Sequence, residues 1–196
     1  MSRHLNIGLQ TAALFVVLIS ASPCVSQGCE ELKLVSATDA VNALDRGEIR
    51  TAFCSRAAFQ LIENLPQEEA IPILIKYLGF KRPISNEVQH GLRSPYPAVD
   101  ALAKVGLAAE PTLIDFIAQQ EDDNSLQRAN AVEALDLIRH GDVVPTIKLM
   151  RERSASLAGT PAANRLDSAA QFMLKTYCPG KLRQRCEQRL KSEQGD

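Results

Sequence analysis

Residues 94–120 read SPYPAVDALAKVGLAAEPTLIDFIAQQ, and residues 125–152 read SLQRANAVEALDLIRHGDVVPTIKLMRE. The two stretches are copies of one unit, with AVDAL (98–102) matching AVEAL (131–135) and AAEPTLI (108–114) matching DVVPTI (142–147). Apolar residues recur at every third or fourth position of each copy, which is the period of an amphipathic helix. We therefore expect two helix hairpins, each consisting of a helix, a tight corner and a second helix that begins with proline.

The prolines set the register of the repeat. The spacing from an alanine of the first helix to the proline of the second is 13 residues in one copy and 14 in the other. Ala58 and Pro72 are also 14 residues apart, so we predict an earlier and more divergent copy at residues 58–78. Proline is tolerated in the first turn of a helix because the first amides have no partner inside the helix.

The apolar side chains of the copies predict close packing between hairpins. Leu74, Leu113 and Ile147 take the same inward position in the three copies. A lone hairpin cannot bury such a face, so neighbouring hairpins must cover it. Small residues would let the paired helices approach closely, and these are Ala98, Ala101, Ala131 and Ala134.

This pattern resembles the bacterial HEAT-like repeat family, over about residues 50–176. The resemblance implies an all-α fold, a short α-solenoid of stacked antiparallel hairpins with roughly three clear repeats and terminal capping helices. It implies a scaffold for binding and carries no single activity. The expected organisation is a signal peptide (1–26), an N-terminal capping segment (27–47), a repeat domain (48–176), and a C-terminal capping helix and tail (177–196).

Helix signals also occur outside the two clear copies. Thr38 is the expected N-cap of a first helix, because its hydroxyl can accept a hydrogen bond from a free amide. We expect residues 151–161 to form a loose connection after the third copy. The further helices predicted from apolar periodicity are 38–45, 48–65, 67–80, 164–177 and 181–191.

The first 26 residues have the composition of an export signal. Arg3 gives a short positive leader, residues 11–21 are nearly all apolar, and Pro23 breaks the run before small residues. The apolar run is about half the length that a membrane-spanning helix needs. We predict cleavage near Ser26, a periplasmic or secreted mature protein, and no stable membrane insertion after cleavage. The alternatives are a retained anchoring helix and a lipid-modified Cys24.

The charge composition argues against binding to nucleic acid. The chain has 22 Lys and Arg against 23 Asp and Glu, a formal net charge of −1. Binding to nucleic acid needs clustered basic residues that replace the counterions of the phosphates. Acidic residues that we expect to dilute the repeat surface are Glu110, Asp115, Glu121, Asp122 and Asp123.

Four cysteines remain after loss of the signal, and an even number in an exported chain predicts two disulfides with three possible pairings. The ends of a stacked solenoid lie far apart, whereas bridged Cα atoms lie within about 7 Å. The resemblance therefore implies that Cys29 pairs with Cys54 and that Cys178 pairs with Cys186. The alternatives are four reduced, buried thiols and a zinc site, which would require cysteines from both ends to meet.

The longest irregular stretch of the domain runs from residue 79 to residue 97 and could recognise an acidic partner or a carboxylate ligand. A solvated connector is the plainer interpretation of this loop. The candidate partner-binding residues in it are Lys81, Arg82, His90, Arg93 and Tyr96.

The last helix, residues 181–191, is rich in Lys and Arg. Its plainer interpretation is the polar outer face of a capping unit, which stacked repeats need for solubility. The alternative is a site for an anionic membrane or nucleic acid.

The sequence contains no motif of catalytic machinery. Outside the signal there are two histidines, His90 and His140, and no pair lies at a metal-binding spacing. Asp100, Glu133 and Asp136 read as solvated helix positions. We therefore predict no catalytic residue, no metal and no cofactor.

Taken together, these patterns predict a non-catalytic, exported scaffold for protein–protein interaction. The second helices of the hairpins would line a shallow concave surface, with exposed positions that include Lys76, Asp115 and Lys148. One alternative is an accessory subunit of an envelope enzyme that docks through loop 79–97. The other is a divergent hydrolase.

Overall fold

The computed structural model describes residues 29–83, 94–121 and 126–192, and within these ranges the chain is helical and contains no strand. The predicted all-α class is therefore confirmed for this part of the chain. The predicted signal peptide lies outside the described residues. The elements in order are η1 (Glu30–Leu32), α1 (Ala37–Asp45), α2 (Ala52–Glu63), α3 (Gln67–Lys76), α4 (Pro97–Val105), η2 (Gly106–Ala109), α5 (Glu110–Gln119), α6 (Leu126–Ile138), α7 (Val144–Ser156), α8 (Pro161–Tyr177) and α9 (Lys181–Ser192).

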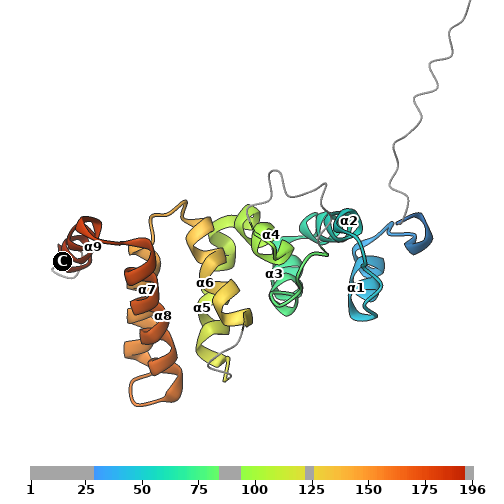
Figure 1. The fold of residues 1–196 in the computed structure, drawn as a ribbon. Coiled ribbons are helices and arrows are strands. Elements are labelled where there is room, and N and C mark those ends of the chain that lie inside the picture. Colours follow the sequence, from blue (N-terminus) through green and yellow to red (C-terminus); the bar gives the residue numbers. More distant parts are fainter. Residues whose placement is uncertain (1–28, 84–93, 122–125, 193–196) are drawn as a thin grey trace, which may run out of the picture.

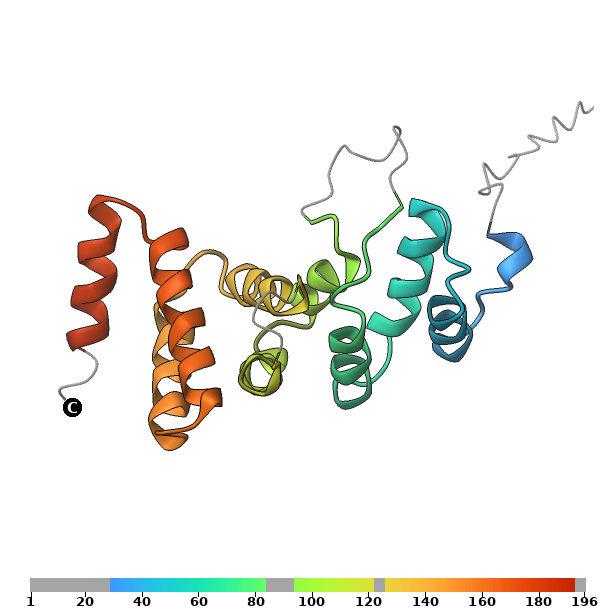
Figure 2. The same cartoon turned by 60° about the horizontal axis from the view of Figure 1, so that its bottom comes forward.

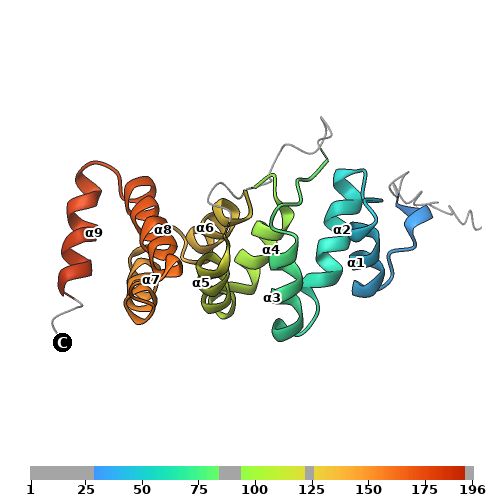
Figure 3. The same ribbon diagram turned by 90° about the horizontal axis from the view of Figure 1, so that it is seen from below.

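The helices lie in a row that follows the chain, from α1 at one end to α9 at the other (Figures 1 and 3). Among the described helices, the main contacts join elements no more than three places apart in the chain. Figure 2 shows the same row after a turn of 60°, with the first and last described helices still at opposite ends. One apolar core runs along the row, from Ala40 in α1 to Leu190 in α9.

The repeated apolar positions are buried as predicted. Leu74 in α3, Leu113 in α5 and Ile147 in α7 are each 0% exposed. The four alanines expected at close helix contacts, at positions 98, 101, 131 and 134, are also 0% exposed. A methyl group is small enough for two helix backbones to approach, so these alanines set the spacing between α4 and α6, which pack on each other.

Side-chain caps fix where several helices begin. The N-cap of α1 is Ser36 and not Thr38, because Ser36 Oγ accepts a hydrogen bond from the Asp39 amide and the Asp39 carboxylate accepts one from the Ser36 amide. Thr51 caps α2, so this helix begins later than predicted. Thr160 caps α8, which begins earlier than predicted, at Pro161.

The three repeat prolines do not share one position. Pro111 and Pro145 lie at the first or second residue of α5 and α7, as predicted. Pro72 lies inside α3, because this helix already begins at Gln67. An interior proline has no amide hydrogen for the carbonyl four residues earlier, so the divergent copy lacks one hydrogen bond of the helix.

The second copy does not form a closed hairpin. His140 and Gly141 both have positive φ, 52° and 86°, and they turn the chain between α6 and α7. Helix α7 then packs mainly on α8. It continues to Ser156, so residues 151–156 of the segment predicted as a loose connection are helical. The Ser154 hydroxyl donates to the Ala163 carbonyl at 3.2 Å, which fastens α7 to the start of α8.

Candidate functional site

The base of loop 79–97 is closed by Arg82. The Arg82 amide donates to the Pro95 carbonyl at 2.9 Å, and its guanidinium lies 3.3 Å from the Asp100 carboxylate in α4. Only 7% of Arg82 is exposed. The sequence grouped Arg82 with partner-binding side chains, but its charge is used within the fold, where it joins both arms of the loop to α4.

Of the other candidate residues in this loop, Lys81 is exposed and Tyr96 is partly buried against the core. His90 and Arg93 lie outside the described residues. Within the described part of the loop, the structure therefore brings one predicted cation, Lys81, to the surface. The grouping of these five side chains into one site therefore stays a prediction.

Three acidic residues predicted as solvated are partly buried. Burial raises the pKa of Asp100, against the opposing effect of the Arg82 and Lys104 charges. Burial also raises the pKa of Asp136. Burial, with repulsion from Asp136 and Glu133, raises the pKa of Tyr177 in α8 to about 12. Their burial depends on neighbouring parts of the fold, which the period of a single helix cannot reveal.

Glu110, predicted on the repeat surface, is buried with 3% exposure. Its carboxylate accepts hydrogen bonds from Arg139 Nε at 3.1 Å and from an Arg139 terminal nitrogen at 2.5 Å. It also accepts a hydrogen bond from the hydroxyl of Thr146, which is 0% exposed. One side chain at the start of α5 thus links the residue that follows α6 to α7. Glu110 therefore supports the fold and is not a surface residue, contrary to the prediction.

Further ion pairs join helices that are two places apart. Lys76 in α3 lies 2.7 Å from Asp45 in α1, and this contact lowers the pKa of Asp45. Lys104 in α4 lies 2.8 Å from Glu63 in α2. Asp115 in α5 lies 2.9 Å from Arg153 in α7. Two of the charges predicted to line the binding surface, Lys76 and Asp115, are therefore engaged with neighbouring helices.

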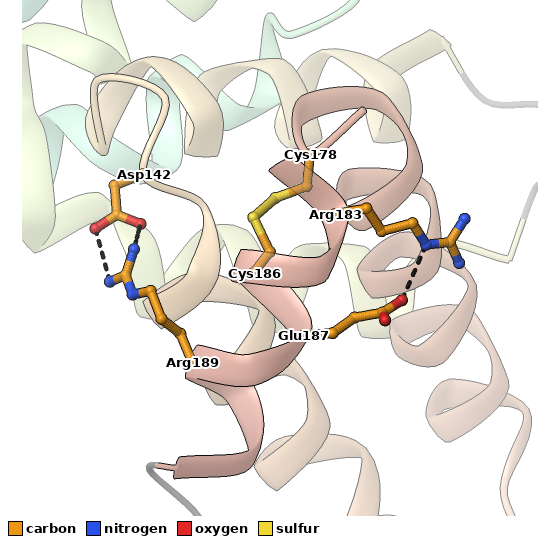
Figure 4. Close-up of a disulfide and its surroundings, with 6 residues drawn as sticks. All are labelled: Asp142, Cys178, Arg183, Cys186, Glu187 and Arg189. Carbon is orange, nitrogen blue, oxygen red and sulfur yellow. Dashed lines mark hydrogen bonds and ion pairs between the residues drawn. A yellow bond between two sulfur atoms is a disulfide. The ribbon is translucent and has the colours of Figure 1, made fainter. Parts of the chain in front are cut away.

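Both disulfides have the pairing that we expected from the sequence. Cys29 is joined to Cys54 with Cα atoms 5.4 Å apart, and Cys178 is joined to Cys186 with Cα atoms 6.5 Å apart. The first bond ties the segment before η1 to α2. The second bond ties the end of α8 to α9 (Figure 4). Each bond therefore fastens the outermost described element at its end of the row.

Helix α9 is held at its flanks and is charged on its outward face. Arg183 lies 2.9 Å from Glu187 on the same helix, and Arg189 lies 2.8 Å from Asp142 before α7 (Figure 4). Hydrogen bonds from Arg189 lower the pKa of Asp142. The outward residues of α9 are exposed and are Lys181, Gln184, Arg185, Gln188, Lys191 and Ser192. We call these six residues the α9 outer face.

In the three described ranges, no group of three or more His, Cys, Asp or Glu side chains could hold a metal ion. None of the helices in the described part of the chain is both long enough and apolar enough to cross a membrane. Comparisons of the chain with protein-family models, with curated proteins and with solved structures found no match.

Proposed function

We propose that this protein is an exported scaffold of HEAT-like helical repeats that binds a protein partner and has no catalytic activity of its own. The observation that carries the proposal is the open row of helices, in which Leu74, Leu113 and Ile147 are buried at equivalent positions along one core. Such a row can be lengthened without closing on itself, so it presents more surface than a compact bundle of the same length. Extended surface of this kind suits binding to another macromolecule.

In this proposal the row is a short solenoid whose two ends are closed by disulfides. Terminal units of a stack lack a neighbour on one side, so they need reinforcement. Cys29–Cys54 and Cys178–Cys186 lie at the two ends of the row, and in the chain-entropy model their loops stabilise by roughly 3.5 and 2.5 kcal/mol. These positions support an architecture in which the ends, and not the middle, are the weak points.

Export is supported by the chemistry of the cysteines. Disulfides persist in oxidising compartments and are rare in the cytosol. The leader-like composition of residues 1–26 agrees with passage into such a compartment. Intact-mass measurement of the protein from the native host tests this part. We expect the mass of a chain that begins near residue 27, lower by four hydrogens than the mass of the same chain in reduced form. An uncleaved cytosolic chain with all five thiols free would contradict export.

Binding is tested by site-specific photocrosslinking in the native host. A photoreactive amino acid is placed at exposed positions on three helices: Gln60 in α2, Thr112 in α5 and Gln188 in α9. We expect a discrete adduct with one protein at one position or more, and none without light. Absence of a discrete adduct at all three positions would refute the proposed function.

A further inference from the structure

We propose that the α9 outer face is the docking site for an acidic segment of the protein partner. This inference rests on the proposed function as a protein-binding scaffold, and it names the surface and the chemistry of the partner. It depends on the placement of α9, the sign of its charges and the disulfide that fixes it.

The placement of α9 leaves one full side of the helix open. Helix α9 contacts α7 and α8, and it buries Cys186 and Leu190, which are 7% and 3% exposed. It is the last described helix of the row, so no later helix in the described chain covers its other side (Figure 3). Lys181 and Arg185 are four residues apart, and this spacing places them on one side of the helix.

The α9 outer face carries charge of one sign. Its charged members are Lys181, Arg185 and Lys191, and its remaining members are neutral. The one acid of the helix, Glu187, lies on the flank and is paired with Arg183. A face that served only solubility would be expected to mix both signs. A face whose charges are all positive attracts an anion.

The second disulfide fixes the position of the helix that carries these charges. Helix α9 is strongly polar and buries little apolar surface, so packing alone holds it weakly. The bond from Cys178 to Cys186 and the pair between Arg189 and Asp142 hold the helix in place (Figure 4). Binding groups that are already ordered lose less conformational entropy when a partner arrives.

The observations favour an acidic protein segment over a lipid surface or a nucleic acid. Cys186 and Leu190 face the protein, and Leu182, 46% exposed, is the one large apolar side chain that α9 leaves at the surface. The helix therefore lacks the broad apolar face with which an amphipathic helix enters an acyl layer. Binding to DNA needs many phosphate contacts, whereas the chain has a net charge of −1 and one short cationic face. A carboxylate-bearing helix or loop matches a face that carries Lys181, Arg185 and Lys191, and Arg185 offers a bidentate contact.

The first test measures binding of the full chain to a fluorescent helical peptide that carries glutamate at every fourth position. The Kd of this peptide is compared with that of a glutamine version, vesicles of phosphatidylglycerol and phosphatidylcholine, and duplex DNA. The test variant is K181Q/R185Q/K191Q. The control K33Q/R50Q/R56Q removes the same charge from exposed residues at the other end of the row. We expect at least tenfold weaker peptide binding for the test variant and an unchanged Kd for the control.

Three results of this test would overturn the inference. The first is equal loss of binding in both triple variants, and the second is equal binding of the glutamine peptide. The third is tighter binding to vesicles or DNA than to the acidic peptide. The double variant C178S/C186S should also weaken peptide binding while the circular dichroism of the remaining helices is kept.

Photocrosslinking in the host separates this inference from the proposed function. An adduct at Gln188 that maps to a segment rich in Asp and Glu, and that disappears in K181Q/R185Q/K191Q, supports both. A discrete adduct at Gln60 or Thr112 without one at Gln188 refutes the docking site and leaves the scaffold function standing. An adduct at none of the three positions refutes both.

Discussion

Replacing Glu110 with alanine should destabilise the protein far more than an ordinary surface substitution. The change removes the carboxylate that accepts hydrogen bonds from Arg139 and Thr146. It leaves a partly exposed guanidinium and a fully buried hydroxyl without that acceptor. Breaking a buried ion pair by removing one partner costs about 3–5 kcal/mol, because the remaining charge is buried without compensation.

The exposure of Arg139 sets the expected magnitude at the lower end of that range. Its side chain is 23% exposed, against 4% for Glu110, so water can partly solvate the guanidinium after the substitution. We expect a loss of about 3 kcal/mol, which for a chain of this size lowers Tm by about 6–12 °C. Thermal and urea unfolding followed by circular dichroism at 222 nm measure both quantities.

Two further variants make this prediction specific. Glu69→Ala removes an exposed carboxylate from the first turn of α3, as Glu110 lies in the first turn of α5, and it should cost no more than about 1 kcal/mol. The triple variant E110L/R139M/T146V removes all three polar groups and should recover most of the loss, because an apolar replacement avoids the cost of burying charge. An E110A loss no larger than that of E69A would refute the proposed role of the carboxylate.

Three further outcomes are expected. The C178S/C186S variant should lose about 2.5 kcal/mol in urea unfolding, since the closed loop is short; an unchanged midpoint would mean that packing alone fixes α9. Leu113→Ala should cost about 2–5 kcal/mol at a fully buried site, and a thermal scan without any loss would place Leu113 outside the core. Absorbance at 295 nm should show the Tyr177 pKa at about 12, and Asp136→Asn should lower it. Because folding raises this pKa, the contribution of Tyr177 to stability is full below about pH 10 and is lost as the pH rises to about 12. A Tyr177 pKa that D136N does not change would exclude the carboxylate as a cause.

Helix periods predicted the buried positions well, because the period of side chains on a helix is a local property. The burial of Leu74, Leu113 and Ile147 follows from that period, and each is 0% exposed. Helix starts were predicted less well. Ser36 and not Thr38 caps α1, because two neighbouring residues can both cap a helix and the better pair of reciprocal hydrogen bonds decides between them.

The surroundings of Arg82 and Glu110 were not predicted, because their charges pair with residues far away in the chain. Arg82 was predicted at a binding surface, yet it pairs with a residue 18 positions later. Glu110 was predicted on the surface, yet its partners lie 29 and 36 positions later. A long segment without apolar periodicity gives no indication of which of its charges will find such a partner.

The sequence by itself determined the helical class, the repeated inward positions and the number of cysteines, since these depend on short-range spacing and composition. The tertiary structure alone decided that α7 packs mainly on α8, that Glu110 contacts Arg139 and Thr146, and that the α9 outer face remains open. The physical reason is that the environment of a charge depends on neighbours brought close by folding. Local spacing fixes which face of a helix is apolar, but it does not fix which helix covers that face.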